Sequence, residues 1–275
     1  MNNLIKQFNS VASFVSYLDE GKTQPSFSEH SITNDFDFTG TRSYPIANDL
    51  CKYGDEESRK LITEAGETLT PSYGYKKTTK MDKTGYLPMV GAYLTGRPNC
   101  MKRRVRQYVP KRVISVVYNA CAPWYVAKSD MALASAKLLS AILRIENSGV
   151  RVNLYLSDIG QSGGNDAGFI VKIKDSGQRL NILSMAYPMI HPSMHRRHFF
   201  RYLEVTEGMP TSFVHGYGCP VKETSTMQNV LRKADIQCDS CISMMELVEK
   251  KHISVDEIIK MIDERHGGTI NNPHR

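Results

Sequence analysis

The clearest pattern of apolar positions in the chain lies between residues 111 and 158. Val113 to Tyr118 form a β-branched run, which is typical of a buried parallel strand. Apolar residues recur at helical spacing from Ser129 to Asn147, and Ser148-Gly149 is a typical helix end. Val150 to Leu156 form a second apolar run. This order predicts a right-handed β-α-β crossover at the centre of an α/β domain.

Shorter patterns predict further elements around this unit. Apolar intervals of three and four predict a helix over residues 3–20, and short helices are expected from Tyr44 to Tyr53 and from Glu56 to Ala65. Residues 66–100 contain many Gly and Pro without periodicity, which predicts a long irregular connection. After the crossover we expect a Gly/Ser loop at 160–168, a strand at 169–174, a strand or short helix at 180–186, and helices at 198–203, at 239–250 and from Ser254.

These patterns divide the chain into four regions: an N-terminal helical and irregular wrapping segment (1–100), an α/β core domain (101–220), a C-terminal helical extension (221–268) and a disordered tail (269–275). A composition of 41% hydrophobic and 23% charged residues is that of a globular protein. No run approaches the roughly 20 apolar residues of a membrane span, and the N-terminus does not have the pattern of a signal peptide. We therefore expect a cytoplasmic protein with no membrane partner, whose six scattered cysteines are free thiols.

Positive charge is concentrated in one stretch of the chain. The net charge is +7 with a pI near 9.0, and seven basic residues and no acid lie between Arg97 and Arg112. Residues 239–264, by contrast, are rich in Asp and Glu. The asymmetry indicates a polyanionic partner such as nucleic acid, and a solvated basic loop is the alternative.

Aromatic residues are interleaved with these basic ones. Tyr108 lies within the basic run, and Tyr93, Trp124 and Tyr125 lie near it. The mixture suits single-stranded nucleic acid, because cations neutralise the phosphates while bases stack on the rings. We therefore expect nucleic-acid contacts from Lys102, Arg103, Arg104, Arg106, Tyr108, Lys111 and Arg112. An acidic protein partner would be attracted by the same residues.

The crossover resembles the opening of von Willebrand factor A-like domains, through the segments RVISVVYNACAP (112–123), MALASAKLLSAILRIENSGV (131–150) and RVNLYLSD (151–158). The resemblance implies a Rossmann-like, mostly parallel sheet flanked by helices, here with helical N- and C-terminal additions. In that family the first strand ends in Asp-x-Ser-x-Ser, whose oxygens hold a divalent metal. The matching residues here, Asn119, Cys121 and Pro123, lack the carboxylate and both hydroxyls, so we expect no metal at that motif.

A second resemblance covers roughly residues 35–220. The β-α-β unit and three further segments are similar to an uncharacterised protein family of tailed bacteriophages: FTGTRSYPIANDLCKYG (38–54), GAYLTGRPNCM (91–101) and RLNILSMAYPMIHPSMHRRHFFRYLE (179–204). The resemblance implies a phage origin and a place in the host cytoplasm, with virion association left open. It implies no activity that transfers residue by residue.

The segment HPSMHRRHFFR (191–201) holds a dense cluster of titratable residues. His191 and His195 would share a helix face, but the adjacent arginines would repel a dication and Pro192 places His191 at the helix start. We therefore expect no metal there. Arg196 and Arg197 could instead bind phosphates as a second basic patch. The alternative is that they pair with structural carboxylates while their aromatic neighbours pack in the core.

Cysteines provide two further candidate sites. His215, Cys219, Cys238 and Cys241 have the residue types and the pairing of a zinc knuckle, although buried structural cysteines explain the pattern equally well. Cys121 follows a strand, at the edge of the sheet where α/β proteins bind ligands. No recognisable base, nucleophile elbow or phosphate-binding loop accompanies it in the sequence, so no catalytic residue and no cofactor are predicted.

The sequence thus predicts a non-enzymatic phage protein that binds single-stranded DNA or RNA with little sequence specificity and recruits replication or transcription machinery. Two alternatives stay open. One is an interaction module or adaptor for an acidic host or phage protein. The other is an enzyme whose site lies at the carboxyl edge of the sheet, with Cys121 or His191. No oligomeric state is predicted.

Overall fold

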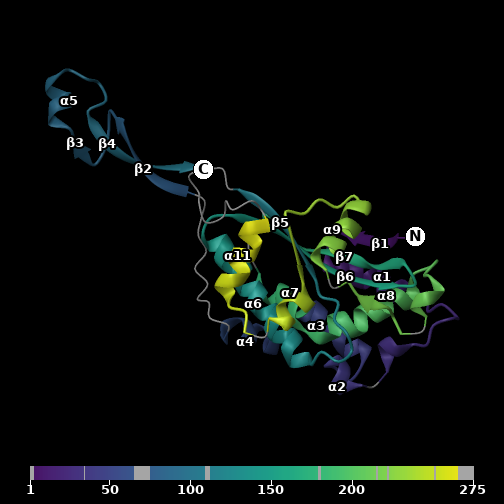
Figure 1. Ribbon diagram of the computed structural model, residues 1–275. Coiled ribbons are helices and arrows are strands. Elements are labelled where there is room, and N and C mark those ends of the chain that lie inside the picture. The colour runs from purple at the N-terminus through teal and green to yellow at the C-terminus, as the bar shows by residue number, and fades with distance from the viewer. Residues whose placement is uncertain are drawn as a thin grey trace.

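A mostly parallel sheet runs through the body of the protein in the order β1-β7-β6-β5-β9, with β8 beside β6 (Figure 1). The computed structural model describes residues 3–33, 35–64, 75–108, 112–178, 181–214, 216–221, 223–250 and 252–265. The strands of this sheet are β1 (Asn3–Phe8), β5 (Val113–Asn119), β6 (Arg151–Ser162), β7 (Asn165–Lys174), β8 (Cys219–Pro220) and β9 (Ser240–Ser243).

The predicted β-α-β unit lies at the centre of this sheet. Strands β5 and β6 pair in parallel and are joined by α6 (Lys128–Asn147). Strand β9 pairs in parallel with the other edge of β5, and β1 pairs in parallel with β7. The pairing of β6 with β7 is antiparallel. The expected α/β class, with a mostly parallel central sheet flanked by helices, is confirmed.

Helices cover the two faces of the sheet unequally. The face that carries Val116, Leu154 and Phe169 forms one large core with helices from along the whole chain. The opposite face, with Val117 and Ile170, packs mainly against α9. The helical elements of the body are α1 (Val11–Glu20), η1 (His30–Ile32), α2 (Phe36–Thr39), α3 (Tyr44–Tyr53), α4 (Glu56–Glu64), α7 (Ile182–Ile190), η2 (Met194–His198), α8 (Phe199–Val205), η3 (Thr211–Phe213), α9 (Thr224–Lys233), α10 (Met244–Glu249) and α11 (Val255–Arg265).

The single helix expected over residues 3–20 is wrong for its first part. Residues Asn3–Phe8 form β1 at the edge of the sheet, and only Val11–Glu20 are helical. Ser10 separates the two elements because its hydroxyl caps the helix by accepting from the Ser13 amide. The apolar intervals were real, but Leu4 and Phe8 face the core from a strand that pairs with the distant β7.

Two other expected elements differ in the same way. Residues 160–168 are not a loop, because β6 and β7 continue through them and only Gly163-Gly164 turn, both with positive φ. Residues 239–250 are not one helix, since Ser240–Ser243 pair with β5 before α10 begins. The expected boundaries at residues 100 and 220 therefore do not enclose the sheet, to which both terminal regions contribute a strand. Residues 269–275 lie outside the described residues.

Other expectations about helices are confirmed. The alternative of a helix near residues 180–186 is correct, since α7 spans Ile182–Ile190, and residues 198–203 are helical. Ser254 and Glu257 form the expected capping box before α11: the Glu257 amide donates to the Ser254 hydroxyl, and the Glu257 carboxylate accepts from the Ser254 amide. No helix in the described part of the chain is long and apolar enough to cross a membrane.

A small second sheet stands apart from the body (Figure 1). Its strands β2 (Tyr75–Asp82), β3 (Leu87–Pro88) and β4 (Met101–Tyr108) pair antiparallel in the order β2-β4-β3, and α5 (Val90–Leu94) lies between β3 and β4. We call residues 75–108 the arm. The expectation of an irregular connection over 66–100 is wrong for residues 75–100, and β4 belongs to the arm rather than to the central sheet.

A buried ion pair supports the junction between α6 and β7. Lys174 Nζ lies 2.6 Å from Glu146 Oε1 and also donates to the Val152 carbonyl, and both side chains are less than a tenth exposed. Glu146 Oε1 in addition accepts from the Val152 amide. The pair thus connects the end of α6 with the strands β6 and β7.

We predict that Lys174→Met lowers the free energy of unfolding by about 3–5 kcal/mol, because it leaves the Glu146 carboxylate buried without its partner. Removing both charges, in Lys174→Met with Glu146→Gln, should restore part of that loss. The control is Lys260→Met, which breaks an exposed pair with Glu264 and should cost less than about 1 kcal/mol. Urea unfolding measures all three, and equal losses for the buried and exposed lysines would contradict the prediction.

Candidate functional site

The arm carries the positive charge of the protein. Residues 75–108 hold nine basic residues and one acid, a net formal charge of +8, whereas the whole chain has +7. The remainder therefore has a net charge of −1. Antiparallel pairing of β2 with β4 brings the basic residues of both strands together, with Lys80 opposite Arg103. Like charges directly across a strand pair repel each other, and the Asp82 carboxylate, which contacts both Lys80 and Arg103, offsets only part of this repulsion.

The two faces of the arm differ in whether their cations pair with a carboxylate. On one face Asp82 lies 3.1 Å from Lys80 Nζ and 3.4 Å from Arg103 Nη1, and its hydrogen bond with Lys80 lowers the pKa of its carboxyl group. The other face presents Lys102 and Arg104, whose side chains make no ion pair with a described carboxylate. The Arg104 guanidinium stacks over the Tyr86 ring at 4.7 Å. That face therefore combines cations with an aromatic surface.

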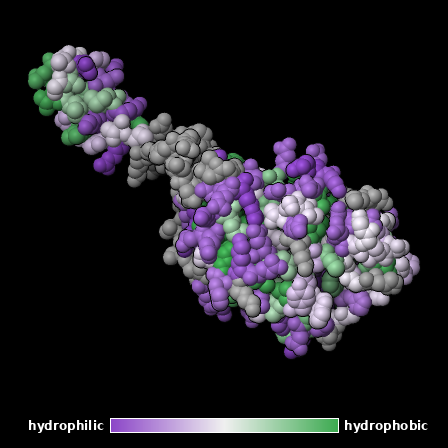
Figure 2. All heavy atoms as spheres, viewed as in Figure 1, coloured by the Kyte–Doolittle hydropathy of each residue, from purple (hydrophilic) through white to green (hydrophobic). Residues whose placement is uncertain are grey.

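Apolar side chains gather at the far end of the arm (Figure 2). None of the residues of α5 is buried, and Tyr93 and Leu94 are 70% and 77% exposed. The exposed apolar and aromatic residues of this tip are Tyr86, Leu87, Met89, Val90, Tyr93 and Leu94. Single exposed apolar residues are common on protein surfaces, but a contiguous exposed cluster is typical of an interaction surface.

Most of the residues expected to contact nucleic acid lie on or next to the arm. Lys102, Arg103 and Arg104 are on β4, with the two arginines exposed and Lys102 half-buried. Arg112 is exposed just before β5. Arg106 and Tyr108 belong to β4, but their side chains lie outside the described part, as does Lys111 altogether.

The expected second phosphate-binding patch is wrong, because Arg196 and Arg197 are buried. Arg197 donates to Thr41 Oγ1 and to the carbonyls of Ser31, Thr33 and Thr41. Arg196 donates to two further carbonyls, those of Phe38 and Val126, and burial lowers its pKa to about 10. The alternative of a structural role is correct, although the acceptors are main-chain carbonyls and the Thr41 hydroxyl rather than carboxylates.

A second group of chemically active side chains meets at the carboxyl end of β5. Cys121 follows β5, Asp158 is on β6 and His195 is on η2. Their candidate ligand atoms all lie within 4.8 Å of one another, and all three residues are buried. His195 Nδ1 lies 2.6 Å from Asp158 Oδ2, and Nε2 lies 3.0 Å from the amide nitrogen and 3.1 Å from the carbonyl oxygen of Ala122.

Burial controls the electrostatics of this cluster. It raises the pKa of the Cys121 thiol well above its usual value, and the Asp158 charge raises that pKa further. Burial also raises the pKa of Asp158, an effect that the neighbouring His195 partly offsets. The thiol is therefore protonated at neutral pH and is a poor nucleophile. Sequence reasoning missed the cluster because its three members come from separate elements, and the one available signal was that Asp158 ends the apolar pattern of a strand beside β5.

The described members of the other candidate cysteine and histidine sites do not come together. Among the described residues, Cys219, Cys238 and Cys241 are not brought together in a group of potential metal ligands, and His215 lies outside these residues. His191 is not part of the Cys121 cluster. Its ring stacks on Tyr187, and its Nδ1 accepts from the Ser193 amide at 3.1 Å.

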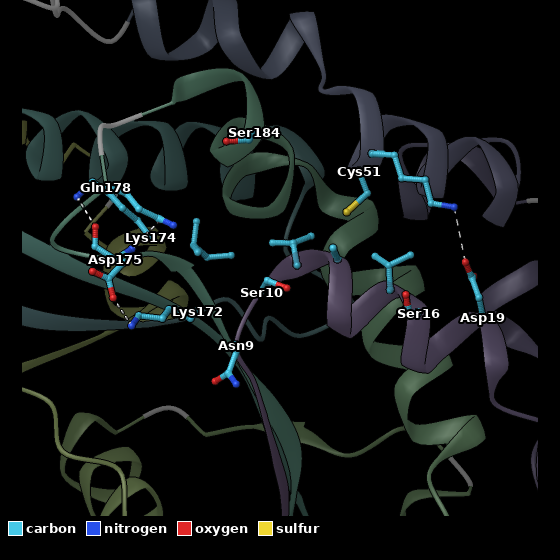
Figure 3. Close-up of a pocket in the computed structure, with 15 residues that line it drawn as sticks. Asn9, Ser10, Ser16, Asp19, Cys51, Lys172, Lys174, Asp175, Gln178 and Ser184 are labelled. Atoms are coloured by element: carbon cyan, nitrogen blue, oxygen red, sulfur yellow. Dashed lines mark hydrogen bonds and ion pairs between the residues drawn. The ribbon is translucent and has the colours of Figure 1, made fainter.

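A cavity of about 780 Å³ opens beside α1 and the end of β7 (Figure 3). Its charged groups largely pair with each other: Lys172 with Asp175 at 2.5 Å, and Lys52 with Asp19 at 3.7 Å. Burial raises the pKa of the Cys51 thiol there to about 12, so this thiol is not reactive at neutral pH.

Comparison with known proteins identifies a family but no function. The family model described as "Domain of unknown function (DUF7192)" matches residues 1–263. No curated protein and no solved structure matches the chain.

We predict that His191 makes stability fall in mild acid. Burial lowers the pKa of folded His191 from 6.5 to about 4, so the unfolded chain binds the proton first as the pH falls. Stability is therefore full above about pH 6.5 and is lost below it, by roughly 2 kcal/mol at pH 5. Urea unfolding between pH 7 and 5 should show a smaller loss for His191→Asn than for the unmodified protein. The same loss in both would contradict the assignment.

Proposed function

We propose that this chain, which belongs to the family described as "Domain of unknown function (DUF7192)", is a non-enzymatic protein that binds nucleic acid through its arm. The observation that carries the proposal is the segregation of charge. The arm has a net charge of +8, against −1 for the rest of the chain. A protein gains affinity for a polyanion when its cations act together on one surface, because each neutralised phosphate releases condensed counterions.

The shape of the arm suits this role. An antiparallel ribbon exposes both of its faces, and the described part of β2 and β4 presents Lys80, Lys102, Arg103 and Arg104. Lys80 and Arg103 are more than half exposed. We assign phosphate contacts to Lys102, Arg103 and Arg104 on β4, and to Lys80 and Lys83 on the opposing strand and its turn.

Single-stranded DNA or RNA is the form of nucleic acid that we favour. Tyr93 is exposed at the tip, and Tyr86 stacks on Arg104 beside the cations of β4. Rings in such positions accept stacked bases without reading their sequence. The prediction of little sequence specificity follows, since phosphate contacts and stacking are common to every base.

The setting of this activity rests on the two sequence resemblances. We infer a phage protein of the host cytoplasm, with a von Willebrand factor A-like core that lacks the metal motif at Asn119, Cys121 and Pro123. In this proposal the arm holds the nucleic acid while the body recruits replication or transcription machinery. The parallel pairing of β5 and β6 around α6 supports the resemblance in fold.

An adaptor function is the second candidate, and the apolar tip favours it. Leu87, Val90 and Leu94 are exposed together, and an acidic protein with an apolar groove would satisfy both the tip and the cations beside it. The two functions differ in their response to nucleic acid, which the following experiment measures.

We predict that Arg103→Glu with Arg104→Glu weakens binding of a labelled single-stranded oligonucleotide by roughly 100-fold or more at low salt, because two phosphate contacts become two repulsions. Fluorescence anisotropy measures the affinity. The matched control is Lys22→Glu with Lys60→Glu, two exposed residues of the body. Both double variants have a net charge of +3, so a general effect of charge would weaken them equally.

Weakening confined to the arm variant supports the proposal. Equal weakening of both variants, or unchanged affinity in the arm variant, would refute it. Binding to no oligonucleotide, together with retention of one acidic protein on the immobilised full chain, would support the adaptor function instead.

A further inference from the structure

We propose that Cys121, Asp158 and His195 form a binding site for one zinc ion inside the body of the protein. The site is independent of the arm and of nucleic acid. The three side chains come from the end of β5, from β6 and from η2, and each is less than 5% exposed. Their candidate ligand atoms lie within 4.8 Å of one another.

The types of donor atom select the metal. A thiolate, an imidazole and a carboxylate are the ligands that zinc takes in proteins, at about 2.0–2.3 Å. Magnesium and calcium require a shell of oxygen atoms, which this cluster does not provide. The matching end of the first strand in von Willebrand factor A-like domains uses hydroxyls and a carboxylate, but here Cys121 and Pro123 replace the serines. The proposed site therefore has a different ligand set and a different metal.

An unsatisfied oxygen is the second, independent observation. Asp158 Oδ1 is fully buried and has no N–H or O–H partner among the described residues, whereas its Oδ2 lies 2.6 Å from His195 Nδ1. The Cys121 thiol lies close enough to this carboxylate to lower its pKa. A buried carboxylate oxygen without a partner costs free energy, and a bound cation would remove that cost. His195 would ligate the metal through Nδ1, with its Nε2–H donating to the Ala122 carbonyl 3.1 Å away. Two atoms that ligate one zinc ion are about 3.3 Å apart in tetrahedral geometry, so the carboxylate would turn from its 2.6 Å contact with Nδ1 and present Oδ1 to the metal.

The zinc ion would have a structural role, holding three separate parts of the fold together. Three side chains occupy three of the four tetrahedral positions, and a water or a main-chain carbonyl completes the set. Because η2 also carries the buried Arg196 and Arg197, an ion here would fix that segment against the ends of β5 and β6. Metal binding would also remove the proton of the Cys121 thiol, so affinity should fall in acid.

Cobalt titration of the full chain, after treatment with a chelator, tests the proposal. We expect one equivalent of Co²⁺ to bind with the absorption bands of tetrahedral thiolate coordination, and Zn²⁺ to displace it. Cys121→Ser should abolish the thiolate band. The matched control is Cys241→Ser, because Cys241 is also buried but belongs to the cluster on the opposite face of the sheet. This control should keep the band.

Asp158→Asn is the second variant, since its amide keeps nearly the same shape while losing the charge. It should weaken cobalt binding by more than about tenfold. Substituting a residue that only hydrogen-bonds to a metal ligand already lowers metal affinity by about that factor, and Asp158 is proposed as a ligand itself. Near-ultraviolet circular dichroism verifies that each variant is folded. The absence of a thiolate band in the unmodified protein at one equivalent of Co²⁺ would overturn the proposal. A thiolate band that persists in Cys121→Ser would overturn it as well.

Discussion

The burial of Arg197 is the constraint on which much of the body depends. A guanidinium removed from water is tolerated only when its N–H groups find acceptors. Arg197 is fully buried, and its acceptors belong to residues 31–41, far from it in the sequence. The N-terminal segment must therefore wrap against η2. The same segment of η2 places His195 beside Asp158, so the wrapping and the cysteine–histidine cluster depend on one another.

The arm differs from this buried part of the body because its described cations and apolar side chains are mostly exposed. None of its described apolar side chains is buried, and small antiparallel sheets without a core are only marginally stable in water. Its ladder pairs Lys80 with Arg103, where opposite charges or β-branched residues would stabilise it better. A sequence that keeps nine cations and an exposed apolar tip on such an element sacrifices local stability. The proposed binding of nucleic acid at that surface would account for this.

The parts of the fold that the sequence predicts are those set by local interactions. Strand β5 and helix α6 have the expected bounds within a few residues, because their apolar periods and the Gly149 stop are local signals. Strand β6 begins where expected but continues past Leu156 to Ser162, where it pairs with β7. Strand β1 was mistaken for a helix because its identity depends on pairing with Asp166–Val171 of β7. The strands of the arm lacked a period, since a ribbon without a core has no buried face to impose one.

The candidate sites also differ in how much of each one is visible in the sequence. The basic residues of β4 were found because charge density is visible in the sequence. Arg196 and Arg197 have the same residue type but the opposite environment, and only the fold reveals the carbonyls that surround them. Cys121 was noted as lying at a strand end, but its neighbours Asp158 and His195 come from other elements. Their meeting is a property of the tertiary structure alone.

The salt dependence of oligonucleotide binding tests the central claim, that the arm neutralises phosphates, most directly. Each phosphate contact with a single strand contributes about −0.7 to the slope of log affinity against log salt concentration. Contacts from Lys80, Lys83, Lys102, Arg103 and Arg104 predict a slope of about −3.5 for the unmodified protein. A slope near zero, with affinity unaffected by salt, would contradict the account.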